Sequence, residues 1–133
     1  MATAEQRNHA INFLKKAQEY LASAEDNVAA SRHTPAAGDA IHAGISAKDA
    51  IVTALTGTTG KGKDHASAAK ELKQALGQRP DAASAERALR ELLSAKGDVE
   101  YGTALVTQSK AQLLVQRARA LVELAVQIAR LGR

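Results

Sequence analysis

Apolar side chains recur at intervals of three and four residues along most of this 133-residue chain. In the first segment with this pattern, the apolar positions are Ala10, Phe13, Leu14, Ala17, Leu21, Ala24 and Val28. Because an α-helix has about 3.6 residues per turn, this spacing places an apolar stripe along one face of a helix. Such a stripe has to be buried against a neighbour, so the pattern predicts a set of packed helices.

Alanine contributes 30 of the 133 residues, whereas the chain holds two tyrosines, one phenylalanine and no tryptophan. Alanine has the highest helix propensity, and the aromatic and β-branched residues that favour strands are scarce. The predicted fold class is therefore all-α. Because the chain is short and its composition is similar along its whole length, residues 1–133 are expected to form a single domain.

Capping residues predict where the first two helices begin and end. Thr3 and Gln6 have the spacing of a capping box, which predicts a first helix over residues 4–31. Pro35 suits the first turn of a helix, so a second helix is predicted over residues 35–56 with Thr34 as its cap.

Glycine, proline and aspartate divide the second half of the chain. Asp64 is the predicted cap of a short third helix over residues 65–76. Asp81 is the predicted cap of a fourth helix, which is expected to end or bend at Gly97 and Asp98. The next residues, 99–105, are expected to form a connector anchored by Tyr101. A fifth helix is predicted from near Thr107 to about Arg130.

The second predicted helix carries apolar residues around more than half of its circumference, so we expect neighbours on several of its sides. Small residues at Ala43, Gly44 and Ala47 let another helix approach closely. Short connections between long amphipathic helices favour antiparallel neighbours. The expected fold is an antiparallel up-and-down bundle of four main helices with a short extra helix, five in all, and the second helix at its centre.

Several functional classes lack the residues that they need. The chain has no cysteine, which excludes disulfides, thiol nucleophiles and zinc sites built on thiolates. No apolar run is long enough to span a membrane, and the first residues lack the layout of a secretory signal, so a cytoplasmic location is expected. The net charge of +4 permits weak attraction to anions but does not require nucleic acid as a partner.

Residues 57–64 approach the pattern of a phosphate-binding P-loop. Asp64, however, stands where that loop needs a serine or threonine to ligate magnesium, and the preceding segment is a predicted helix rather than a strand. A flexible basic connection between two helices is the preferred interpretation.

The four histidines provide little support for catalysis or for a metal site. No two of them are spaced as ligands within one helix, so no metal and no cofactor is predicted. His42 and Asp49 are seven positions apart on one helical face, and His65 begins the neighbouring helix, so the three could meet in space. An alternative function is therefore a nucleic-acid-directed, ribonuclease-like enzyme with its site there. A purely structural or regulatory bundle is a third interpretation.

Two stretches of the chain carry a family resemblance. One is Ala-Ile-His-Ala-Gly-Ile-Ser-Ala-Lys-Asp-Ala-Ile at 40–51, and the other is Val-Glu-Tyr-Gly at 99–102, followed by Lys-Ala at 110–111 and Arg-Ala-Arg-Ala-Leu-Val at 117–122. Together they resemble the HEPN family of small helical bundles. The resemblance covers the layout of residues 4–130, with His65 at the start of the short third helix. Ribonucleases of this family use an arginine followed by four to six residues and a histidine. No histidine in this chain has such an arginine, and Arg32 precedes His42 by ten positions.

The resemblance therefore implies the branch of the family that lacks this motif. Its members are non-catalytic modules that accompany a small nucleotidyltransferase and are expected to bind a nucleotide or a protein partner. For this chain it implies a homodimer with such a nucleotide ligand or nucleotidyltransferase partner. The residues that it implies for the ligand site are His42, Ser46, Asp49, His65 and Tyr101.

Overall fold

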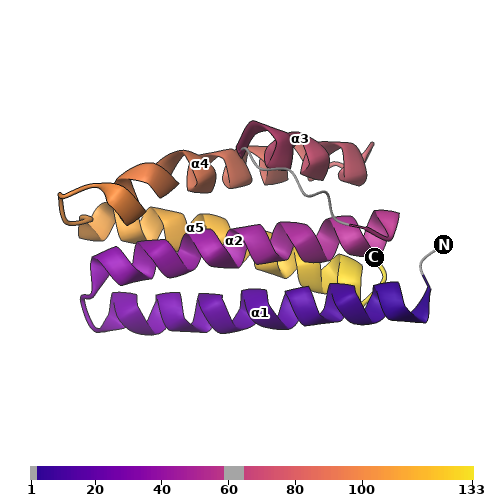
Figure 1. Cartoon of the computed structure of the whole chain (residues 1–133), viewed down its shortest axis with the longest axis horizontal. Helices are drawn as coiled ribbons and strands as arrows, with labels where there is room; N and C mark the ends of the chain where they lie inside the picture. Colours follow the sequence, from indigo (N-terminus) through magenta and orange to yellow (C-terminus); the bar gives the residue numbers. More distant parts are fainter. Residues whose placement is uncertain (1–2, 59–64) are drawn as a thin grey trace.

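The computed structural model describes residues 3–58 and 65–133, with the side chains of residues 65 and 66 left outside the description. Its elements are α1 (Ala4–Ala29), α2 (His33–Thr56), α3 (His65–Leu76), α4 (Ala82–Tyr101), α5 (Gln108–Ala125) and the π-helical turn η1 (Val126–Arg130). These residues contain no strand, which confirms the all-α prediction. Figure 1 shows α1 and α2 side by side along most of their length.

Threonine hydroxyls cap two of the helices: Thr3 as predicted, and Thr107, which was predicted only as the region where the fifth helix starts. At the start of α1 the Thr3 hydroxyl accepts from the Gln6 backbone N–H at 3.1 Å, and the Gln6 side chain accepts from the Thr3 N–H at 2.7 Å. At the start of α5 the Thr107 hydroxyl accepts from the Lys110 N–H at 3.1 Å. Both contacts satisfy backbone donors that have no acceptor within their own helix.

The Thr107 cap provides a test of how much α5 depends on its first turn. We expect Thr107→Ala to lower the free energy of unfolding by about 1 kcal/mol, because the Lys110 N–H loses its acceptor. Chemical denaturation measures the change. Thr103→Ala, at an exposed position in the connection before α5, is the matched control and should stay within about 0.5 kcal/mol of the parent. Equal effects of the two substitutions would contradict the capping role.

The side chains predicted to cap the second and the fourth helix make other contacts instead. α2 begins at His33 rather than Pro35, and the Thr34 hydroxyl accepts from the Val106 N–H at 3.1 Å instead of capping the helix. Pro35 lies in the first turn, where a missing N–H removes no helical hydrogen bond. Asp81 precedes α4 without a side-chain cap, and its carboxylate lies 3.2 Å from Nε of Arg79. The predicted cap Asp64 lies outside the described residues.

The ends of two helices differ from the predictions, and the last turn of a third differs in form. α1 ends two residues earlier, at Ala29, and Ser31 adopts a positive φ of 61° in the turn that follows. α4 does not end at Gly97 and Asp98 but continues to Tyr101, because the extra turn packs Val99 against the core. Tyr101 was expected to anchor the connection that follows, but it is 81% exposed and does not do so. The fifth helix reaches Arg130 as predicted, but its last turn is π-helical.

The core is built around α2, which contacts α1, α3, α4 and α5. Many of its inward positions are alanine or glycine, so neighbouring backbones approach closely. At Gly44 an added Cβ would lie 2.5 Å from Cδ1 of Leu92 on α4. Within the described part of the chain, α2 is the one helix that touches all the other α-helices, which agrees with its predicted central place.

The search for membrane spans covered the described residues. Among them, no helix combines the length and the apolar character needed to cross a membrane.

Candidate functional site

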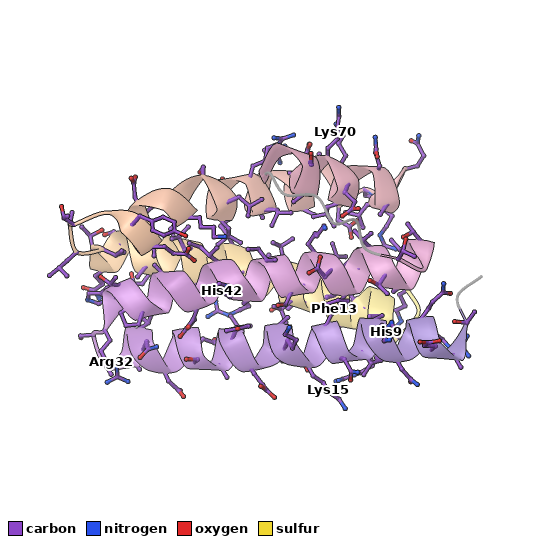
Figure 2. The ribbon with its side chains drawn as sticks, in the orientation of Figure 1. His9, Phe13, Lys15, Arg32, His42 and Lys70 are labelled. Carbon is purple, nitrogen blue, oxygen red and sulfur yellow. The ribbon has the colours of Figure 1, made fainter. Side chains whose placement is uncertain are left out.

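His42 lies near the middle of α2 and contacts two other helices (Figure 2). Its ring stacks on the ring of Tyr20 from α1, with centroids 5.2 Å apart and 30° between the planes. Its Nε2 lies 3.5 Å from Oε1 of Glu100 on α4, so the protonated imidazole forms an ion pair there. The His42 side chain is 45% exposed, which leaves part of the ring open to solvent.

Asp49 belongs to a different charged cluster, at the contact between α2 and α3. Its Oδ1 lies 3.2 Å from Nζ of Lys48, and the same ammonium forms an ion pair with Glu71 of α3. Lys48 is only 5% exposed, although it is charged. A buried ammonium is stable only when carboxylates compensate the loss of water, so the two acids hold Lys48 in place.

The residues implied by the family resemblance are spread along α2 and beyond it. His42 faces Glu100 of α4, whereas Asp49 forms an ion pair with Lys48 of its own helix, so the two side chains belong to separate contacts. Ser46, one turn along α2 from His42, is 8% exposed. Tyr101 projects into solvent at the end of α4, and the side chain of His65 lies outside the description. Within residues 3–58 and 67–133, no three histidine or acidic side chains come together as a metal site.

A groove of about 420 Å³ lies between the first half of α1 and the last turns of α2. It is lined by His9, Asn12, Phe13, Lys16, Thr53, Gly57 and Thr58. The four residues from α1 share one helical face, since they are spaced by three and four. Figure 2 shows Lys15, between them in sequence, pointing away from the bundle.

This α1–α2 groove has a buried threonine at its floor and charged or polar side chains at its rim. The Thr53 residue is 2% exposed, and its hydroxyl has no hydrogen-bond partner in the described residues. At the rim, Lys16 is exposed and has no ion-pair partner in the same part of the chain, whereas His9 lies 3.9 Å from Glu5. The groove therefore combines an aromatic ring, an amide and an available ammonium. Sequence analysis missed it because its residues come from two helices whose relative rotation was unknown.

Two arginines of α5 pair with acids of neighbouring helices. Nε of Arg117 lies 2.6 Å from Glu91 on α4, and Arg119 lies 2.8 Å from Glu25 on α1. On α4 itself, the hydrogen bond from Arg90 lowers the pKa of Glu86. Such pairing leaves little free positive charge on these faces to follow a phosphate backbone.

Comparison of the sequence with known protein families and with curated proteins found no match.

Proposed function

We propose that this chain is a non-catalytic helical module of HEPN type that binds a nucleotide or a partner protein such as a nucleotidyltransferase. In this proposal it is a cytoplasmic single domain, an antiparallel up-and-down bundle that works as a homodimer. The family resemblance, without the Arg-x4–6-His ribonuclease motif, provides the basis for the proposal.

The way in which His42 and Asp49 are held supports binding over catalysis. A general acid and a general base have to reach the same substrate, each within hydrogen-bond distance of its proton. Here the His42 imidazole faces Glu100 and Tyr20, whereas the Asp49 carboxylate faces Lys48 beside α3. This arrangement suits stable packing of helices better than proton transfer at one centre.

The α1–α2 groove is our proposed nucleotide site. Its volume of about 420 Å³ lies within the usual range for small-ligand sites. The Phe13 ring offers an apolar face to a base, Asn12 offers an amide to the base edge, and Lys16 offers an ammonium to a phosphate. The sequence-implied residues His42, Ser46, Asp49, His65 and Tyr101 form the competing site within the same proposal.

Thermal unfolding in the presence of a panel of nucleotides tests whether the protein binds one of them. A nucleotide that binds only the folded state stabilises it by about 2.7 kcal/mol at one hundred times its Kd. We expect a mono- or diphosphate nucleotide to raise the melting temperature of the parent protein. Lys16→Ala should weaken binding roughly tenfold by removing the phosphate contact, which corresponds to about 1.4 kcal/mol.

Lys15→Ala is the matched control, because the neighbouring lysine has the same charge but points away from the groove. If Lys15→Ala and Lys16→Ala weaken binding equally, general charge and not the groove attracts the nucleotide. Loss of binding in His42→Ala alone would move the site to the residues that the resemblance implies. If no nucleotide stabilises the protein and a co-encoded nucleotidyltransferase does not bind it in calorimetry, the proposed function is wrong and a structural bundle is favoured.

A further inference from the structure

The connection between α4 and α5 exposes two large apolar side chains. Tyr101 is 81% exposed and Leu105 is 86% exposed, the highest values among the large hydrophobic residues described as exposed. Exposed apolar side chains that lie next to each other commonly mark a protein interface. Figure 1 shows this connection at the end of the molecule opposite to the two chain termini, so a partner bound there leaves both termini free.

Backbone hydrogen bonds hold this connection in a defined shape. The Gly102 N–H donates to the carbonyl of Asp98 at 3.1 Å, and the Val106 N–H donates to the Thr34 hydroxyl of α2 at 3.1 Å. The connection is therefore tied to the bundle on both sides of Leu105. Apolar side chains on such a fixed backbone lose little conformational freedom when a partner covers them.

A groove of about 570 Å³ lies between the last turns of α4 and the first turn of α5. Leu105 forms part of its wall, and Tyr101, although not part of the lining, precedes the lining residue Gly102 in the chain. Exposed apolar groups and a groove thus lie on one surface. In a twofold dimer the same patch of each copy forms the interface, so one patch has to carry both the protruding groups and the groove that accepts them.

The charges on this groove are also self-complementary. Asp98 and Lys110 both line it, and neither has an ion pair within the described part of the chain. Each charge is also unfavourable for its own helix. Asp98 is negative in the last turn of α4 and Lys110 is positive in the first turn of α5, and the helix dipole favours the opposite charge at each of these ends. Local helix stability therefore does not account for these two charges.

We infer that this connection surface, formed by Asp98, Tyr101, Leu105, Lys110 and the groove between them, binds a second copy of the chain across a twofold axis. Tyr101 and Leu105 of each copy insert into the groove of the other, and each Asp98 faces the Lys110 of the other copy. The inference rests on the homodimer of the proposed function and is independent of its ligand.

Sedimentation velocity over a wide range of concentration tests the apolar contacts. The parent protein should be a dimer, and Leu105→Ser should raise the dimer dissociation constant by about 100-fold, because the change occurs twice in a symmetric interface. Leu131→Ser, at a 52% exposed position near the C-terminus, is the control and should leave the dimer intact. Circular dichroism checks that both variants keep their helices.

Charge reversal gives a second, independent test. Asp98→Lys or Lys110→Asp alone should weaken the dimer roughly tenfold, and the double variant should restore it, because opposite charges face each other again. Each single variant should also unfold at a higher temperature when measured as a monomer, since its new charge suits the helix end. A mere loss of folding cannot produce this combination of weaker association and higher thermal stability.

The absence of native cysteine permits a direct test of proximity. Leu105→Cys provides one thiol per chain, so a short bifunctional maleimide should join two copies, whereas Leu131→Cys should not be joined. If the dimer persists in Leu105→Ser, or if cross-linking occurs only at position 131, this interface is wrong, but the proposed homodimer is unaffected. If the parent protein is monomeric at every concentration, both the interface and the homodimer are wrong. If a monomeric parent binds a co-encoded nucleotidyltransferase and Leu105→Ser abolishes that binding, the surface serves another protein and the inference of a second copy is wrong.

Discussion

Replacing Lys48 with methionine is expected to lower the free energy of unfolding by about 3 kcal/mol, the largest effect of any substitution considered for this chain. Lys48 is 5% exposed, and its ammonium lies between Asp49 of α2 and Glu71 of α3. Methionine fills a similar volume, so the change removes the charge while it preserves most of the packing. Two carboxylates then remain close together at the contact between α2 and α3 without the cation that attracts both of them.

Chemical denaturation of Lys48→Met and Lys70→Met measures this effect. Lys70 is on the same α3 helix as Glu71 but points away from the bundle (Figure 2), so its replacement should change stability by less than about 0.5 kcal/mol. The double variant Lys48→Met/Glu71→Met should recover part of the loss, because it removes one of the two acids together with the cation. A cost for Lys48→Met that is no larger than that for Lys70→Met would show that the buried ion pairs contribute nothing to the docking of α3.

Gly44→Val is expected to lower the free energy of unfolding by about 2 kcal/mol, because the new side chain would collide with Leu92 of α4. An added Cβ would lie 2.5 Å from Cδ1 of Leu92 and 3.5 Å from Cδ1 of Leu121, closer to Leu92 than carbon atoms pack. Leu92 is itself fully buried, so it cannot turn toward solvent to make room. The substitution therefore forces α2 and α4 apart or drives Leu92 into an unfavourable rotamer.

Gly38→Val is the matched control on the same helix. A Cβ at that position meets only Cγ1 of Val99, at an ordinary distance of 3.9 Å, and valine and glycine differ by only a few tenths of a kcal/mol in helix propensity. We therefore expect Gly38→Val to be close to neutral in denaturation experiments. Adding Leu92→Ala to Gly44→Val should relieve the overlap, so the double variant should be more stable than the sum of the single effects implies. Strict additivity would mean that the two side chains do not compete for space.

The helical stripes could be predicted because they depend on local periodicity. Ala10, Leu14, Ala17 and Ala24 were assigned to the inner face of the first helix from their spacing, and the structure buries all four. The Thr3 cap was equally accessible to sequence analysis, since a capping contact spans three residues, whereas Thr107 was identified only as the start of the fifth helix. The fifth helix reaches its predicted end, although periodicity did not distinguish an α-helical last turn from a π-helical one.

The predictions that were wrong concern residues with two competing partners. Thr34 was expected to cap a helix, but it accepts a hydrogen bond from Val106, which is far away in sequence. α4 was predicted to end or bend at Gly97, and it does not end there, because the packing of Val99 against the core and the contact of Glu100 with His42 favour one further turn. In each case a long-range contact outweighs a local preference of about 1 kcal/mol.

Sequence analysis alone could not determine which polar side chains meet. His42 and Asp49 share a face of α2 by spacing, yet His42 contacts Tyr20 and Glu100, whereas Asp49 pairs with Lys48, whose ammonium also pairs with Glu71. The buried Lys48 was missed for the same reason, since its two acids come from different helices.

The amino-acid sequence by itself determined that the described chain is helical and which face of each helix is apolar, because periodicity and alanine propensity act within a few residues. Only the tertiary structure decided the partners of the polar side chains, the grooves between helices and the exposed ends. Those features depend on how far each helix is rotated and shifted against its neighbours. That arrangement is set by the packing of small residues such as Gly44 across the core, which no local pattern records.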